Sequence, residues 1–231
     1  MNVLMKEVDG PVVYLTLNRP ERRNALNRKL CERLIAELSS ASSDEGVRAV
    51  VLRGAGTAFC GGADVSELRT LSDRDALSAR AELTTQLLQA VAELDVPVLA
   101  AVNGPAVGAG ASLAFSCDGI VMAEDATLSF PELQHGIPPL LILPGLQRHI
   151  GRLATFEVLT RGKPITARQA LDRRWVSHVV PNEQLQSEVR AWALQISELS
   201  RQAVAATKRL ARATETLSLS EALSKAVATY R

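Results

Sequence analysis

Apolar and polar segments alternate along the first fifty residues in a way that separates strands from a helix. Residues 12–17 form a β-rich run that ends at Pro20, and residues 47–52 form a Val-rich run suited to a strand covered on both faces. Between them, apolar positions at helical spacing predict a helix over about 27–38, closed by the serine-rich stretch that follows. This order of elements predicts an α/β architecture.

The same plan repeats in the next part of the chain. The pattern predicts these elements in order: a helix over about 76–93, a strand over 96–102, a glycine-rich loop over 103–110, a helix of small residues to about Cys117, and short strands over 119–122 and 127–130. Because loops at the ends of parallel strands gather at one edge of a sheet, we expect the functional site there.

From residue 154 onward the pattern is mostly helical, with an interruption at 177–181. Two amphipathic stretches, 185–199 and 201–230, end the chain. Their apolar faces are suited to packing either on the core or on a neighbouring subunit. We therefore divide the chain into a core over 1–190 and a C-terminal helical segment over 191–231 for packing or trimerisation.

Composition and charge exclude several classes of protein. The 231 residues are 47% apolar and 22% charged, as in a globular domain with a sizeable core, and 26 basic against 25 acidic residues leave a net charge of +1. This balance argues against a nucleic-acid partner. The apolar runs are shorter than the roughly 20 residues of a membrane helix, so no membrane partner is expected. Acids as early as Glu7 leave no room for a secretory signal, and a cytoplasmic location is expected.

The residues that usually bind metals are scattered. Three cysteines lie far apart without a C-x-x-C pair, which predicts free thiols rather than disulfides or a zinc site. The three histidines contain no i, i+4 pair, and we expect neither a metal nor a permanently bound cofactor.

Two loops of small residues, 54–64 and 103–110, follow predicted strands. Neither carries a complete nucleotide-binding motif, which disfavours a dinucleotide or nucleoside triphosphate. Glycine and alanine at a strand-to-helix turn expose backbone N–H groups, and two such groups converging from different loops form an oxyanion hole. The alternative is that both loops are only tight turns.

Five ordered motifs carry a resemblance to a known family. They are Asn18–Asn27 (NRPERRNALN), Ala58–Val65 (AFCGGADV), Ala101–Gly110 (AVNGPAVGAG), Cys117–Ile120 (CDGI), and Phe130–Leu133 (FPEL) with Gly136–Pro139 (GIPP). Together they resemble the successive signatures of the enoyl-CoA hydratase/isomerase (crotonase) family. The resemblance implies a crotonase-like spiral of ββα units with a helical C-terminal region, assembled as homotrimers or hexamers. It also implies an enzyme, of fatty acid metabolism, that takes an acyl-CoA thioester, with coenzyme A present only as part of the substrate.

Matching positions imply roles for particular residues. The N–H groups of Ala63 and Ala109 would form the oxyanion hole for the thioester oxygen. The remaining matched positions would bind the coenzyme A part of the substrate: Arg22, Arg23, Ala25, Asp64, Val65 and Ser66. For the two arginines, a solvated surface position is the alternative.

One departure from the family pattern bears on the reaction. Glu132 stands at one of the two glutamate positions that the hydratases typically use, but Ser112 stands at the other. Serine cannot act unaided as a general base at neutral pH. A Ser112 hydroxyl can orient a water that Glu132 activates, which favours enoyl-CoA hydratase chemistry; hydrogen bonding of Ser112 to local backbone is the alternative.

Three other functions remain open. Glu132 acting as a single base would give Δ3,Δ2-enoyl-CoA isomerisation. A serine followed twenty residues later by a glutamate also resembles the hydroxycinnamoyl-CoA hydratase-lyases. Loss of the first acid also allows a non-catalytic acyl-CoA-binding relative.

Overall fold

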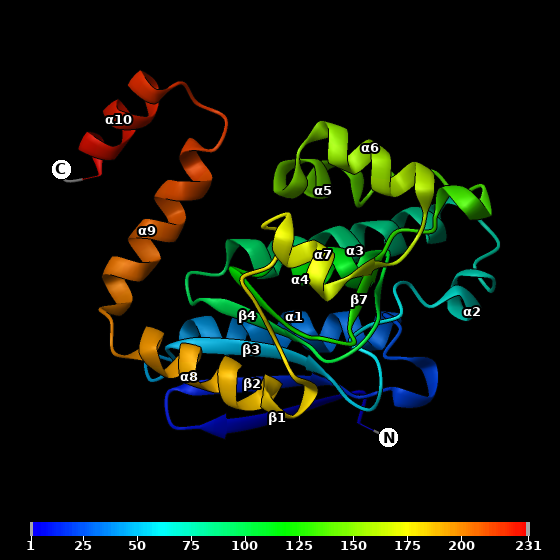
Figure 1. The fold of residues 1–231 in the computed structure, drawn as a ribbon, viewed down its shortest axis with the longest axis horizontal. Helices are drawn as coiled ribbons and strands as arrows, with labels where there is room; N and C mark the ends of the chain where they lie inside the picture. The colour runs from blue at the N-terminus through cyan, green and yellow to red at the C-terminus, as the bar shows by residue number, and fades with distance from the viewer. Residues whose placement is uncertain (1, 230–231) are drawn as a thin grey trace.

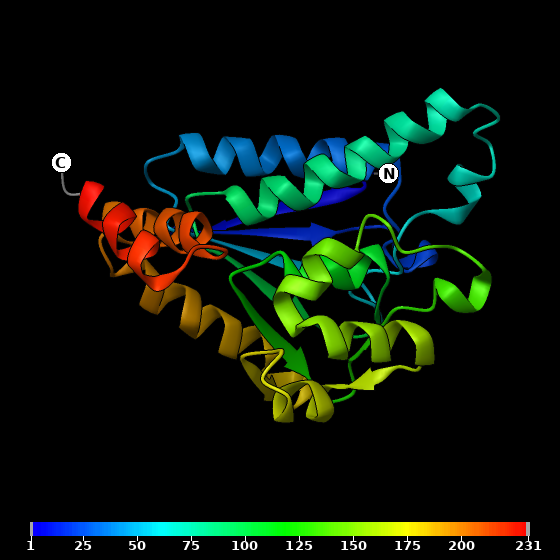
Figure 2. The same ribbon diagram turned by 90° about the horizontal axis from the view of Figure 1, so that it is seen from above.

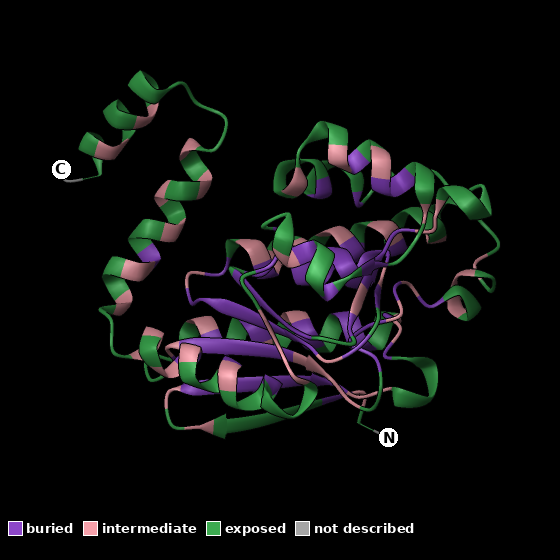
Figure 3. Cartoon of the chain, in the orientation of Figure 1, coloured by how far each residue is buried: buried purple, intermediate pink, exposed green. Residues whose placement is uncertain are grey.

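The computed structural model describes residues 2–229, and a six-stranded sheet forms its centre (Figure 1). The strands lie in the order β1-β2-β3-β4-β6-β9, with β1 antiparallel to β2 and the others parallel. Their bounds are Leu4–Asp9 (β1), Val12–Leu17 (β2), Ala49–Gly54 (β3), Val98–Val102 (β4), Gly119–Ala123 (β6) and His178–Val180 (β9). All residues of β2, β4 and β6 are buried, as expected for parallel strands covered on both faces (Figure 3).

A second, smaller sheet turns this arrangement into a spiral. It contains β5 (Ala106–Val107), β7 (Thr127–Ser129) and β8 (Ile165–Thr166), and isolated bridges extend it through Cys60–Ala106 and Leu26–Ala63. Each turn of the chain thus adds a strand to the large sheet, an extended segment to the second layer, and then a helix. This is the strand, strand, helix repeat expected from the motifs.

Helices cover both faces of the large sheet (Figure 2). The helices α1 (Arg28–Ser43) and α3 (Arg74–Glu93) lie side by side on one face, and α8 (Leu185–Ser197) crosses the other. Asn27 begins α1 by accepting a hydrogen bond from the Leu30 N–H at 3.0 Å. The helix was expected to end near residue 38, but buried Ala41 continues its apolar face to Ser43.

The remaining α-helices of the body are α2 (Val65–Leu68), α4 (Ala109–Phe115), α5 (Leu143–Ile150), α6 (Arg152–Arg161) and α7 (Ala167–Asp172). Of these, α4 packs on β5, and α7 packs on β8 and β9. The interruption expected at 177–181 proves to be β9, which pairs in parallel with β6. The N-terminal residues, to which no element was assigned from sequence, form the edge strand β1.

The C-terminal helices differ in how closely they pack. The helix α8 spans residue 190 and packs on β2, β3, β4 and β6. The stretch expected over 201–230 is two helices, α9 (Arg201–Thr214) and α10 (Leu219–Ala228), separated before Ser218, which caps α10; Tyr230 and Arg231 lie outside the described residues. These two helices project from the body as an arm in which Ala205 is the one buried residue within 201–228 (Figures 1 and 3). The division into a core and a C-terminal segment stays a prediction.

Within residues 2–229, none of the helices combines the length and the apolar character needed to cross a membrane.

Candidate active site

The two glycine-rich loops meet at the start of α4. The Val107 N–H donates to the Cys60 carbonyl at 2.9 Å, and the Cys60 N–H donates to the Pro105 carbonyl at 3.3 Å. Gly62 has φ +89°, and a β-carbon built on it lies 2.7 Å from the Val107 carbonyl oxygen and 3.8 Å from the Ala109 nitrogen. Only glycine therefore allows the first loop to approach the second so closely.

This contact brings Ala63, which follows Gly62, into the neighbourhood of Ala109. The Leu26 N–H donates to the Gly62 carbonyl at 2.7 Å, and the Leu26 carbonyl accepts from the Asp64 N–H at 3.0 Å. Because Leu26 pairs with Ala63 in this way, the Ala63 N–H points away from Leu26. Ala109 is the first residue of α4, where an N–H has no carbonyl partner within the helix. Within residues 2–229, neither of these two N–H groups donates to another backbone carbonyl. Both amides are thus available to an oxygen of a bound molecule.

The carboxyl group of Glu132 lies beside the same turn. A β-carbon on Gly108, the residue before Ala109, would stand 2.3 Å from Glu132 Oε1. Glu132 Oε2 is buried and has no hydrogen-bond partner among the described residues. Burial raises the pKa of Glu132 above its ordinary value, although a hydrogen bond from its own backbone and the charge of His135 oppose this effect. A buried carboxylate oxygen without a partner is costly, and such groups concentrate at functional sites.

Ser112 lies one turn into α4, and its backbone N–H donates to the Gly108 carbonyl at 2.9 Å. Its side chain is 7% exposed, and Oγ makes no hydrogen bond to any described residue. The local backbone bond considered as an alternative for this hydroxyl is therefore absent from residues 2–229. Ser112 is also one of the residues that line a cavity of about 940 Å³, together with Phe115 and Leu146; Ala63, Ala109 and Glu132 are not among its lining residues.

A second cavity, of about 410 Å³, lies beside both glycine-rich loops, with Thr57 and Ala58 from the first and Pro105 from the second among its lining residues. Arg22 and Arg23 line it together with Gly61 and Val107. The two arginines thus lie beside the loop that carries Ala63. Ala25 follows them, and its carbonyl accepts a hydrogen bond from the Arg19 guanidinium at 2.5 Å.

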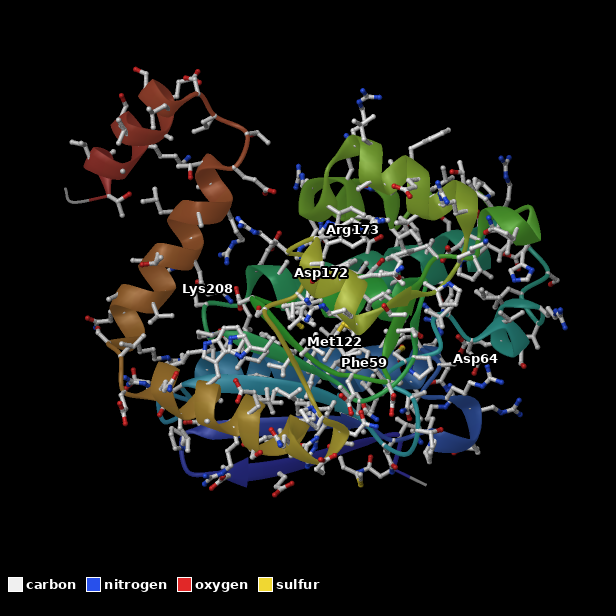
Figure 4. The ribbon with its side chains drawn as sticks, in the orientation of Figure 1. Phe59, Asp64, Met122, Asp172, Arg173 and Lys208 are labelled. Carbon is white, nitrogen blue, oxygen red and sulfur yellow. The ribbon has the colours of Figure 1, made fainter. Side chains whose placement is uncertain are left out.

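The side chain of Asp64 is engaged within the protein. Its Oδ1 caps α2 by accepting from the N–H groups of Ser66 and Glu67, and its Oδ2 pairs with Arg19 at 2.8 Å. These hydrogen bonds to Arg19 and the backbone keep the pKa of Asp64 below its ordinary value, although burial opposes them. Val65 and Ser66 are exposed on α2, and Asp64 lies where that short helix begins (Figure 4).

Two buried side chains that sequence reasoning did not single out hold these loops. Asn24 is fully buried and donates to the carbonyls of Ala55 and Ala58 at 2.9 and 2.8 Å. Arg80, on α3, donates to the Leu26 carbonyl at 2.5 Å. The left-handed backbone at Asn24, with φ +56°, is the kind of local feature that an asparagine in a loop signals.

Comparison with known proteins identifies the family. The enoyl-CoA hydratase/isomerase family model matches residues 7–230. The chain belongs to the enoyl-CoA hydratase/isomerase family. A probable enoyl-CoA hydratase of Bacillus subtilis is 34% identical over 212 residues, which cover 91% of this chain and 82% of the relative. The 2,3-dehydroadipyl-CoA hydratase of Escherichia coli is 33% identical over 231 residues, which cover 97% and 88%.

Solved structures of family members share the fold. The crystal structure of an enoyl-CoA hydratase from Mycobacterium smegmatis superposes with a TM-score of 0.96 at 33% identity, covering 100% of this chain and 90% of that one. An enoyl-CoA hydratase from Bacillus anthracis gives a TM-score of 0.94 at 29% identity, and the match covers 99% of this chain and 89% of that one. The expected crotonase fold, with its helical C-terminal region, is confirmed.

Proposed function

We propose that this family member is an enoyl-CoA hydratase that adds water to a 2-enoyl-CoA. The observation that carries this proposal is the position of the Glu132 carboxylate, whose Oε2 is buried and unpartnered and which lies next to the turn that presents the Ala109 N–H. A base in this position lies within reach of a substrate whose thioester oxygen is held at Ala63 and Ala109.

The proposed reaction uses one carboxyl group for both proton transfers. Glu132 takes a proton from water while the water oxygen bonds to C3 of the enoyl group. The electrons of the double bond move onto the thioester oxygen, where the N–H groups of Ala63 and Ala109 stabilise the enolate. Glu132 then gives its proton to C2, so that the elements of water are added across the double bond. A pKa raised above the ordinary value favours return of the proton from Glu132 once it has been accepted.

Ser112 supports hydration over isomerisation. Its buried hydroxyl lacks a hydrogen-bond partner among the described residues. A water bound there would give the hydroxyl a partner and would itself be oriented for attack on C3.

For coenzyme A, the 410 Å³ cavity bordered by Arg22 and Arg23 suits the phosphate-bearing end of the substrate. The exposed Leu219, Leu223 and Val227 on α10 suit packing against other copies of this chain, as in a trimer or hexamer.

The alternative reaction is Δ3,Δ2-enoyl-CoA isomerisation, which needs only one base and is favoured by the lack of a second carboxylate at position 112. The same residues are compatible with a hydroxycinnamoyl-CoA hydratase-lyase or with binding without turnover.

Incubation with a panel of thioesters separates these reactions. Hydration of a 2-enoyl-CoA removes the absorbance of the conjugated double bond, whereas isomerisation of a 3-enoyl-CoA creates it. We expect loss of absorbance with 2-enoyl esters and a reduced rate of this loss in Ser112→Ala. If only 3-enoyl esters react, giving a conjugated product, the activity is isomerisation and not hydration. Release of an aldehyde from aromatic esters would indicate the lyase. Binding without any turnover would overturn an enzymatic function.

A further inference from the structure

Arg80 is the most deeply buried charged side chain in the described part of the chain, with 2% of its surface exposed. Its guanidinium makes three separate hydrogen bonds. Nε donates to Glu67 Oε2 at 2.8 Å, Nη1 to Thr84 Oγ1 at 2.7 Å, and Nη2 to the Leu26 carbonyl at 2.5 Å. Burying a charge is unfavourable unless it is fully paired, so these contacts indicate a defined task for Arg80.

The Leu26 carbonyl that Arg80 binds belongs to the segment paired with Ala63. It accepts two hydrogen bonds, one from the Arg80 guanidinium and one from the Asp64 N–H at 3.0 Å. The Leu26 N–H donates to the Gly62 carbonyl at 2.7 Å. The peptide groups on both sides of Ala63 are therefore fixed by Leu26, and the direction of the Ala63 N–H follows from theirs.

The carboxylate that pairs with Arg80 anchors the same two segments a second time. Glu67, on α2, accepts the Arg28 N–H at 2.9 and 3.1 Å, and Arg28 is the first residue of α1. Glu67 also lies in the helix whose N-terminus Asp64 caps. The segments 26–28 and 62–67 are thus joined at Gly62, Asp64 and Glu67, and the Arg80 guanidinium binds one residue of each, Leu26 and Glu67.

We propose that Arg80 is a positioning residue for catalysis, which fixes the Leu26 carbonyl and thereby aims the Ala63 N–H at the thioester oxygen. The proposal rests on the proposed function, because it gives Arg80 a role only if Ala63 binds that oxygen. Three donors held in one plane suit this task, because each satisfies a different acceptor from a fixed centre. A lysine ammonium lacks this planar arrangement of donors and would leave one or more of the three acceptors unpaired.

The test compares Arg80 with a matched arginine elsewhere in the fold. Arg53, on β3, makes analogous bonds to Thr16 Oγ1, Gln186 Oε1 and Glu7 Oε2, but it contacts α8 and β1 rather than the glycine-rich loops. The variants are Arg80→Lys, Arg80→Met, Arg53→Lys and Arg53→Met. For each we would measure Tm, kcat and KM with the thioester that the wild type turns over, and the infrared stretch of bound butyryl-CoA labelled with 13C at its carbonyl.

We expect the Arg80 variants to lower kcat by about a hundredfold for methionine and by about tenfold for lysine, with KM changed by less than threefold. Their carbonyl band should move towards its position in free butyryl-CoA, because a misaligned N–H polarises the carbonyl less. The Arg53 variants should lower Tm while kcat and the carbonyl band stay as in the wild type. If Arg80→Met does not fold, the same comparison between Arg80→Lys and Arg53→Lys decides.

Folded Arg80 variants with wild-type kcat and an unshifted band, whatever their Tm, would overturn the positioning role. Equal losses of kcat in the Arg53 variants would also overturn it, because the effect would then be one of general stability. A wild-type protein that leaves the carbonyl band of bound butyryl-CoA at its free position would instead contradict the oxyanion hole itself. The failure of this inference is thus distinguishable from the failure of the proposed function.

Discussion

The carboxylate of Glu132 lies so close to the α-carbon of Gly108 that a β-carbon there would stand 2.3 Å from Oε1. Gly108 also has φ +52°, a backbone conformation that residues with side chains rarely adopt. The position before α4 therefore requires glycine for two reasons: its backbone has a positive φ, and the Glu132 carboxylate occupies the space of a side chain.

Gly108→Ala tests this relationship. The added methyl group must displace the carboxylate or the turn that carries the Ala109 N–H, and we expect kcat to fall by about a hundredfold and Tm to fall as well. The control is Gly46→Ala, which lies in the loop before β3 where a β-carbon meets only the flexible Asp44 side chain at 3.2 Å. Steady-state kinetics and thermal unfolding provide both quantities. Unchanged kcat in Gly108→Ala would show that Glu132 does not work from its observed position.

The buried carboxyl group predicts a particular pH dependence of stability. Burial raises the pKa of Glu132 above its ordinary value of 4.5, so the folded protein holds this proton more tightly than the unfolded chain. The contribution of this group to stability therefore decreases as pH rises from about 4.5 through the folded-state pKa, and it stays low above that value. Glu132→Gln removes this dependence, and we expect it to have a higher Tm than the wild type at pH 8.

Thermal unfolding at several pH values measures the difference in Tm between Glu132→Gln and the wild type. It should shrink towards zero only below about pH 4.5, where the carboxyl group of the wild type becomes neutral in the unfolded chain as well as in the folded protein. The matched control is Glu82→Gln, an exposed glutamate on α3 that contacts Ser78. A gain in Tm that is equal at all pH values would mean that the burial of charge at Glu132 is not its cause.

Charged groups contribute to holding α9, the first helix of the arm, against the body of the protein. Lys208 has 10% of its side chain exposed and contacts the Asp118 carboxylate and the Val96 carbonyl, and Arg209 pairs with Asp95 at 2.8 Å. Burial lowers the pKa of Lys208, and the charge of Asp118 opposes this effect. In Figure 4 Lys208 lies on the side of α9 that faces the body of the protein. The following turns of α9, including Arg212, form one wall of the 940 Å³ cavity.

Lys208→Met should loosen this wall, because it removes the contact with Asp118 while keeping a side chain of similar length. We expect faster amide hydrogen exchange throughout α9 and unchanged exchange in β2 and β3. Lys225→Met, on the exposed surface of α10, is the control and should leave exchange in α9 as it is. If Lys208→Met leaves the exchange of α9 unchanged, packing rather than charge holds the arm.

Much of the fold follows from local patterns. The Val-rich run at 47–52 and the loops after it predicted parallel strands with a site at their ends, because both signals lie within a few residues. The strand β9 was missed because it is three residues long and gains its stability from pairing with β6, about sixty residues away in sequence. The serine-rich end of α1 misled for a similar reason, since only the packed structure shows that Ala41 is buried.

Some features of the site could likewise be predicted from local sequence, and others could not. Positions on the two loops could be proposed from sequence, because glycine and alanine at a strand end have a direct consequence for exposed N–H groups. The part played by Arg80 could not, because an arginine in the middle of a helix is usually solvent-exposed and its contact with Leu26 spans 54 residues. The sequence likewise left the state of the Ser112 hydroxyl open, which depends on atoms of other elements.

The most direct test of the site is the exchange of hydrogen at C2 of butyryl-CoA in D2O, followed by mass spectrometry. This saturated ester cannot be hydrated, so exchange reports only removal of a proton by a base beside an oxygen held as an enolate. We expect the wild type to incorporate deuterium and Glu132→Gln to do so at least a hundredfold more slowly. Absence of incorporation in the wild type, or equal rates in both proteins, would contradict the assignment of Ala63, Ala109 and Glu132 as one catalytic centre.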